Sequence, residues 1–227
     1  MNRPSSSSLG MLRLYQLVSP ALPVGAYNFS QGLEYAVHAG WVSDETSTLQ
    51  WIKGVAQHSV ALLDLPLLLR MQRAWSAGDE RQARRWNAEL MASRESEELR
   101  AEERHMGRSL AKVLCALDVG GAESFIKDNT TYACMFALAT SHWNIDEREA
   151  AMAFLWAWCE NQVLAALKIL PIGQTAGQRM LNELLQHIPF MVDTAMQVMD
   201  EDIGAAAPRL SMASAWHETQ YSRLFRS

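Results

Sequence analysis

Several patterns that would assign a chemical activity are missing from this 227-residue sequence. It has no GxxxxGK[ST] phosphate loop, no GxSxG nucleophile motif, no HExxH and no CxxC pair, and its six histidines are scattered singly. These absences argue against P-loop nucleotide binding and against a convergent metal site. The formal net charge of −5 argues against nucleic acid as the main partner, because neutralising phosphates needs a surplus of Lys and Arg.

Cysteine is also scarce. Cys115, Cys134 and Cys159 are odd in number, widely spaced and set in apolar helical patterns, which indicates buried free thiols rather than disulfides. The early run of serines at residues 5–8 has no apolar segment before it, so no signal peptide is predicted. We therefore expect a cytoplasmic protein.

Apolar side chains are abundant. Hydrophobic residues make up 49% of the sequence, which is enough for a substantial core. Residues 150–170 are almost wholly apolar and about as long as a membrane span. Glu160, Asn161, Gln162 and Lys168 interrupt them, and such groups are costly in a bilayer. We predict a helix buried inside the protein and no membrane partner.

Helical periodicity dominates, and no strand alternation is evident. The sequence predicts an all-α protein, a single compact domain of about ten helices. Residues 1–8 should be a flexible N-terminus, residues 9–203 the helical domain and residues 204–227 a C-terminal tail. Pro66 should restart the chain after residue 64, and Pro189 should kink or break the last long helix.

The tail differs in composition from the rest. It contains three arginines and only one acidic residue, and aromatic side chains are interspersed with arginine near its end. It can fold back as an ordinary last helix, or become ordered in a groove of a partner protein. His217 and Glu218 form an isolated pair, too few donors for a first-row metal, so no metal site and no cofactor is predicted.

Two other features bear on function. The charged run at residues 94–108 is typical of a solvated helix face with intrahelical ion pairs, although it could also dock a charged partner. Lys168 follows a long stretch without cations, near the end of the most apolar helix and just before a Pro-Ile-Gly-Gln turn. It could snorkel as a helix-end cation or lie on a functional surface.

Four stretches together carry a recognisable pattern. They are LVSPALPVGA followed by SQGLE (residues 17–26 and 30–34), MGRSL (106–110), LPIGQTAGQ (170–178) and HETQYSRLFRS (217–227). In order, spacing and total length the chain resembles the urease accessory protein UreF family. The run Tyr27-Asn28-Phe29 departs from the more usual FSYS-like sequence.

The resemblance implies an all-α, non-catalytic protein that binds UreD (also called UreH). That pair recruits the GTPase UreG and couples GTP hydrolysis to nickel insertion into apo-urease. Members of the family tend to dimerise, so a homodimer is possible. Alternatives are a helical GTPase regulator not tied to urease and a helical enzyme with an unrecognised site. The residues expected to bind partners are Glu34, Lys168, Gln174, His217, Glu218, Tyr221, Arg223, Leu224, Phe225 and Arg226.

Overall fold

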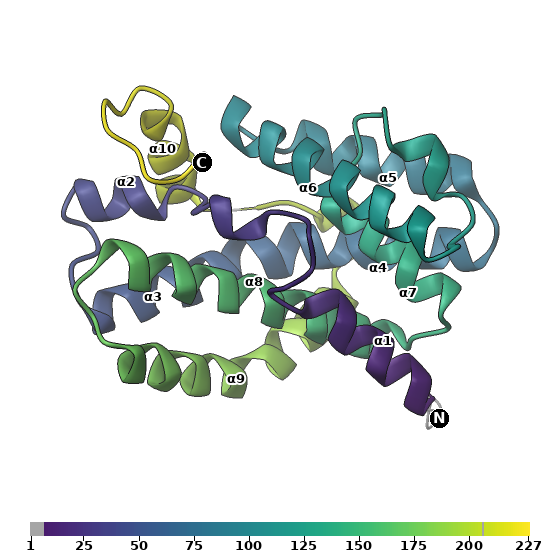
Figure 1. The fold of residues 1–227 in the computed structure, drawn as a ribbon, viewed down its shortest axis with the longest axis horizontal. Coiled ribbons are helices and arrows are strands. Elements are labelled where there is room, and N and C mark those ends of the chain that lie inside the picture. Colours follow the sequence, from purple (N-terminus) through teal and green to yellow (C-terminus); the bar gives the residue numbers. More distant parts are fainter. Residues whose placement is uncertain (1–6, 206) are drawn as a thin grey trace.

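The structure, a computed structural model, describes residues 7–205 and 207–227. Within them the chain forms ten α-helices and no β-strand, in one compact domain (Figure 1), which confirms the all-α prediction. The helices are α1 (Ser8–Val18), α2 (Leu33–His38), α3 (Glu45–Val55), α4 (Leu65–Ser76), α5 (Glu80–Ala92), α6 (Glu97–Ala116), α7 (Tyr132–His142), α8 (Glu147–Ile169), α9 (Gln174–Gln197) and α10 (Pro208–His217). Short helical segments η1 (Ala26–Asn28), η2 (Ala56–Asp64), η3 (Ala122–Phe125) and η4 (Asp200–Asp202) connect them.

Most helices begin where a short polar side chain can accept a hydrogen bond from the first turn. Asp44, Asp79, Ser96, Thr131 and Asp146 do so at the starts of α3, α5, α6, α7 and α8. Each satisfies a backbone N–H that the helix itself leaves unpaired. These starts were readable in the sequence because the interaction that sets them is local.

The predicted restart at Pro66 is wrong. One continuous helix runs over Glu45–Ser76, through α3, η2 and α4. The middle segment η2 has the wider π-helical turn, and Pro66 lies directly after it, at the second residue of α4. By length and composition this helix could cross a membrane, but 72% of its most apolar window is buried inside the protein.

A break at Pro189 is also not seen, because α9 continues through this residue to Gln197. At the other end of the chain, Ser7 caps α1 and Ser8 is its first residue, so the predicted flexible N-terminus is already helical there. The rest of that prediction, residues 1–6, lies outside the described residues.

The core is formed mainly by α4, which packs on α5, α7, α8 and α9, and by α8, which also packs on α1 and α2. Residues 150–169 lie in α8, where most of the apolar side chains face this core. A second, smaller apolar cluster joins α2 and the end of α8 to one residue of the tail, Phe225. The tail is thus part of the packing of the domain.

Candidate functional site

The C-terminal tail folds back onto the body of the protein. Helix α10 lies against α2, and residues 218–227 loop back toward the first loop of the chain (Figure 1). Gly32, just before α2, allows this approach, since a Cβ there would crowd Ala213 and the backbone of Ser214. Of the two alternatives for the tail, the structure shows the folded-back one.

His217 is the centre of the contact between tail and body. Its side chain is 0% exposed, with Nδ1 2.6 Å from Glu98 Oε2 and Nε2 3.1 Å from Glu34 Oε2. Each nitrogen of the imidazole ring therefore lies within hydrogen-bond distance of one carboxylate oxygen. The arrangement joins side chains of α2, α6 and α10 in a site that is largely closed to water.

Glu34 also holds the segment that follows. Its two carboxylate oxygens accept hydrogen bonds from the backbone N–H of Leu224 (2.7 Å) and of Phe225 (2.9 Å). Phe225 itself is 5% exposed and fills the smaller apolar cluster. Glu34, His217 and Phe225 are therefore buried within the chain in this conformation, and they hold the tail in place.

The end of the tail is fixed by a second carboxylate. Ser227 Oγ donates to Glu102 Oε2 (2.8 Å), while Gln31 Nε2 donates to the other oxygen of Glu102 (2.7 Å). The main-chain oxygen of Ser227 accepts from both the N–H and the hydroxyl of Ser30. Burial raises the pKa of Glu102 to about 7, although the two hydrogen bonds that it accepts act in the opposite direction.

Next to Glu102 lies a buried ion cluster. The guanidinium of Arg94 pairs with the carboxylates of Asp64 and Glu103, and Glu103 also accepts from the N–H of Tyr132 at the start of α7 (2.9 Å). The charged run at residues 94–108 is thus only partly a solvated face. Glu97 does form the expected intrahelical pairs with Arg100 and Arg104.

Lys168 lies at the edge of the docked tail. Its Nζ donates to the carbonyl oxygen of Tyr27 (3.3 Å) and lies 5.5 Å from the ring centres of both Tyr27 and Phe225. The lysine therefore joins the end of α8 to the first loop and to the tail. Gln174 opens α9 and is exposed.

The remaining expected residues lie on the outside of the tail. Tyr221 and Leu224 are largely exposed, Arg223 pairs with Glu98 (2.6 Å), and Arg226 is exposed. The carboxylate of Glu218 accepts a hydrogen bond from the N–H of Glu97 (2.7 Å). Glu218 therefore places a negative charge at the N-terminus of α6, where the helix dipole favours one. The structure thus divides the ten residues into those that clasp the tail and those that face solvent.

Sequence reasoning missed Glu98 and Glu102, which contact the tail directly. Both belong to a run of glutamates that looks uniform in the sequence, although its first members, Glu95 and Glu97, are exposed and its last, Glu102 and Glu103, are buried. A helical-wheel projection would have put Glu98, Glu102 and Leu99 on one side of α6, and this was the available signal.

Metal coordination is not favoured by this geometry. Within the described residues no group of three His, Cys, Asp or Glu side chains converges on a point. Glu34 and Glu98 bind opposite nitrogens of His217, so their oxygens diverge from any shared position.

Fold and site together define a class: an all-helical, single-domain protein whose C-terminal segment is clasped to the body by buried carboxylates. Comparison with known proteins places it more closely. The chain belongs to the UreF family, whose model matches residues 42–185. It is 44% identical to "Urease accessory protein UreF" of Alkalilimnicola ehrlichii over the full length of both chains.

Further relatives show the same extent of similarity. "Urease accessory protein UreF" of Hahella chejuensis is 46% identical, over 96% of this chain and 99% of its own. "Urease accessory protein UreF 2" of Brucella anthropi is 47% identical over 98% of both chains. These alignments extend beyond the residues that the family model matches, so the similarity includes most or all of the tail.

Proposed function

We propose that this chain is a non-catalytic scaffold in urease maturation, which binds UreD (UreH) and with it recruits the GTPase UreG to apo-urease. In this assembly GTP hydrolysis by UreG drives nickel, the cargo, into the urease active site. Membership of the UreF family supports a role in urease maturation. The choice of partners follows from the family resemblance and from the surface of the tail.

The single observation that carries the proposal is the surface that the clasped tail presents. Tyr27, Tyr221 and Leu224 are large apolar side chains left more than half exposed, next to the cations Lys168 and Arg223. Aromatic side chains and arginine are typical of the energetically important centre of a protein interface. An exposed apolar patch of this kind is typical of a surface that a partner covers.

Co-expression tests the proposal directly. The tagged chain is produced with UreD, UreG and apo-urease, captured, and the bound proteins are identified; urease activity and its nickel content are then measured with and without the chain. We expect UreD to be retained, UreG to be retained only when UreD is present, and the chain alone to hydrolyse no GTP. Capture of no urease component would reject the proposal. Nucleotide-dependent capture of UreG without UreD would favour the generic regulator instead.

A second surface fits a homodimer. Helices α1 and α9 flank an apolar groove, and Met11, Tyr15 and Leu185 at its edges are exposed. Among its lining residues one ionisable carboxylate, Glu149, is present. A face with so little charge can pair with a second copy of itself without repulsion, as a two-fold interface requires. Tyr15→Arg should shift the sedimentation of a dimer to that of a monomer while the far-UV circular dichroism stays unchanged.

A further inference from the structure

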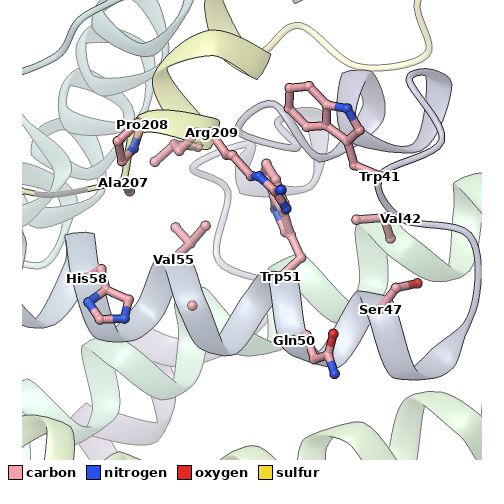
Figure 2. A pocket seen from close by; sticks show the side chains of 12 residues that line it. Trp41, Val42, Ser47, Gln50, Trp51, Val55, His58, Ala207, Pro208 and Arg209 are labelled. Carbon is pink, nitrogen blue, oxygen red and sulfur yellow. The ribbon is translucent and has the colours of Figure 1, made fainter.

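A groove of about 300 Å³ opens on the body of the protein where α10 begins (Figure 2). One wall and the floor come from the continuous helix Glu45–Ser76, with Trp51 and His58 along it. Gly54, between these two residues in the sequence, also lines the groove. The opposite wall is the first turn of α10, including Pro208 and Arg209. The groove is therefore composite, because the clasp around His217 holds one of its walls in place.

Two indole rings line one end of this groove. Trp41 and Trp51 are half-buried and pack against each other with ring centres 6.3 Å apart. The guanidinium of Arg209 lies 6.0 Å from the ring centre of Trp41. Trp and Arg are the residues most enriched among interface hot spots, and here they surround a hollow that a side chain can enter.

Gly54 makes the hollow deeper. It lies within α3, where glycine lowers helix stability, and a Cβ at this position would meet no atom within 4 Å. The α3 backbone is consequently uncovered at the floor of the groove. Helix packing gives no reason for a glycine here, whereas an occupant that approaches the backbone closely would give one.

The charge of the groove is opposite to that of the whole protein. The chain has 25 acidic residues and a net charge of −5, yet none of the residues that line the groove is Asp or Glu. Arg209 and His58 are both exposed on its rim, and neither has an ion pair within the described part of the chain. An unpaired guanidinium and an exposed imidazole beside an apolar hollow complement a carboxylate that is attached to an apolar group.

We propose that this composite groove binds a short segment of a partner protein in which an apolar side chain is flanked by carboxylates. The apolar side chain occupies the hollow over Gly54 between Trp51 and α10, and a carboxylate pairs with Arg209. Because α10 supplies one wall, the segment binds the protein with its tail clasped. This inference goes beyond the proposed role in urease maturation and does not depend on the identity of UreD or UreG as partners.

Two matched synthetic peptides test the chemistry. One is the acetylated and amidated pentapeptide Asp-Asp-Leu-Phe-Asp, and the other has every Asp replaced by Lys. The readout is the NMR signal of each indole N–H, with those of Trp41 and Trp51 identified by Trp41→Phe and Trp51→Phe. We expect the acidic peptide to shift these two signals and to saturate in the millimolar range, and the lysine peptide to bind at least tenfold more weakly.

Three variants then separate groove binding from non-specific association. Gly54→Leu should weaken binding of the acidic peptide at least tenfold because it fills the hollow, and Gly54→Ala should weaken it by a smaller factor because its single methyl group takes up only part of that space. Arg209→Glu should reverse the preference toward the lysine peptide. Circular dichroism reports whether each variant is folded. If Gly54→Leu does not fold, Arg209→Glu still provides the test, because Arg209 is exposed.

Several results would overturn the inference. They are absence of any shift at Trp41 and Trp51, equal binding of the two peptides, undiminished binding to folded Gly54→Leu, or an unchanged preference in Arg209→Glu. Each of these outcomes can occur whether or not UreD is captured by the same chain, so the two proposals fail independently.

Discussion

The imidazole of His217 lies between the carboxylates of Glu34 and Glu98, 3.1 Å from one and 2.6 Å from the other, although Glu34 and His217 are 183 residues apart in sequence. Three helices contribute one side chain each: α2, α6 and α10. The same two carboxylates also bind Arg223 and the backbone N–H groups of Leu224 and Phe225. These hydrogen bonds hold the tail against the body, together with Phe225 in the smaller apolar cluster and Ser227 on Glu102.

Replacing His217 by alanine should release the tail. The substitution removes both hydrogen bonds of the imidazole ring and leaves Glu34 and Glu98 without this partner, and leaving a buried polar group unpaired typically costs about 1–3 kcal/mol. Hydrogen exchange at the amides of Leu224 and Phe225 should become much faster, while exchange in α4 and α8 stays slow. His142→Ala, at an exposed helix end, is the control and should leave the tail amides protected. Unchanged protection in His217→Ala would mean that the contacts of Phe225 and Ser227 are enough to anchor the tail.

Stability should depend on pH through Glu102. Its pKa is raised from 4.5 to about 7 in the folded protein, chiefly by burial, so the folded state binds the proton more tightly than the unfolded state does. The stability that it contributes is complete below pH 4.5 and is lost as pH rises through about 7. At about 1.4 kcal/mol per pKa unit the loss amounts to about 3 kcal/mol.

Glu102→Gln should remove this dependence, since the amide never ionises. Chemical unfolding at pH 5 and at pH 8 measures the effect: relative to wild type, the variant should gain stability at pH 8, and the gain should shrink at pH 5. Glu123→Gln, exposed in η3, serves as the control. A stability difference that is the same at both pH values would show that Glu102 does not titrate in this range.

Gly107 explains why the MGRSL stretch needs a glycine. Helix α6 crosses the segment before α7 so closely that a Cβ at residue 107 would overlap the carbonyl group of Thr130 and the carbonyl carbon of Thr131. Gly107→Ala should therefore force the two backbones apart and lower the free energy of unfolding by about 3 kcal/mol. Gly54→Ala, in a helix with open space around it, should instead raise it by about 0.5–1 kcal/mol. Urea unfolding of both variants makes the comparison.

The helix boundaries could be predicted because caps act locally. Asp79 and Ser96 bind N–H groups within three residues of themselves, and Gly78 adopts the positive φ that ends the preceding helix. The expected restart at Pro66 and the expected break at Pro189 were wrong, because at both positions the chain tolerates a proline within a continuing helix. At Pro66 the wide turn of η2 absorbs the lost hydrogen bond, which no pattern in the sequence signals.

The site was predicted less completely, because what decides it is long-range. Composition marked the tail as unusual, and the resemblance directed attention to Glu34, Lys168 and His217. Neither of them could show that the side chain of Phe225 is buried and that of Tyr221 exposed, because the two orientations depend on where α2 and α6 contact the tail. Glu98 and Glu102 acquire their role only when residues more than 100 positions away pack against them.

We expect Lys168 to contribute to UreD binding and to add only a little to the stability of the fold. Lys168→Ala removes the hydrogen bond to the Tyr27 carbonyl and the contacts with two aromatic rings, worth about 1 kcal/mol together. Thermal unfolding should show this small loss, and the pull-down with UreD should show a clear one. Lys112→Ala, on the exposed face of α6, should change neither. If Lys168→Ala loses stability and keeps UreD, the lysine supports the tail and does not contact the partner.

The exposed side chains of the tail give the sharpest test of its role as an interface. Tyr221→Ala and Leu224→Ala remove groups that face solvent, so each should change the free energy of unfolding by no more than about 0.5 kcal/mol. Each should nevertheless weaken UreD binding by about 2 kcal/mol, or roughly 30-fold, if these side chains anchor the interface. Met199→Ala, another largely exposed apolar side chain but outside the tail, should leave binding unchanged. Titration of purified UreD against each folded variant gives the dissociation constants. Equal affinities for all three variants and wild type would place the UreD contact elsewhere and leave the clasped tail with a purely structural role.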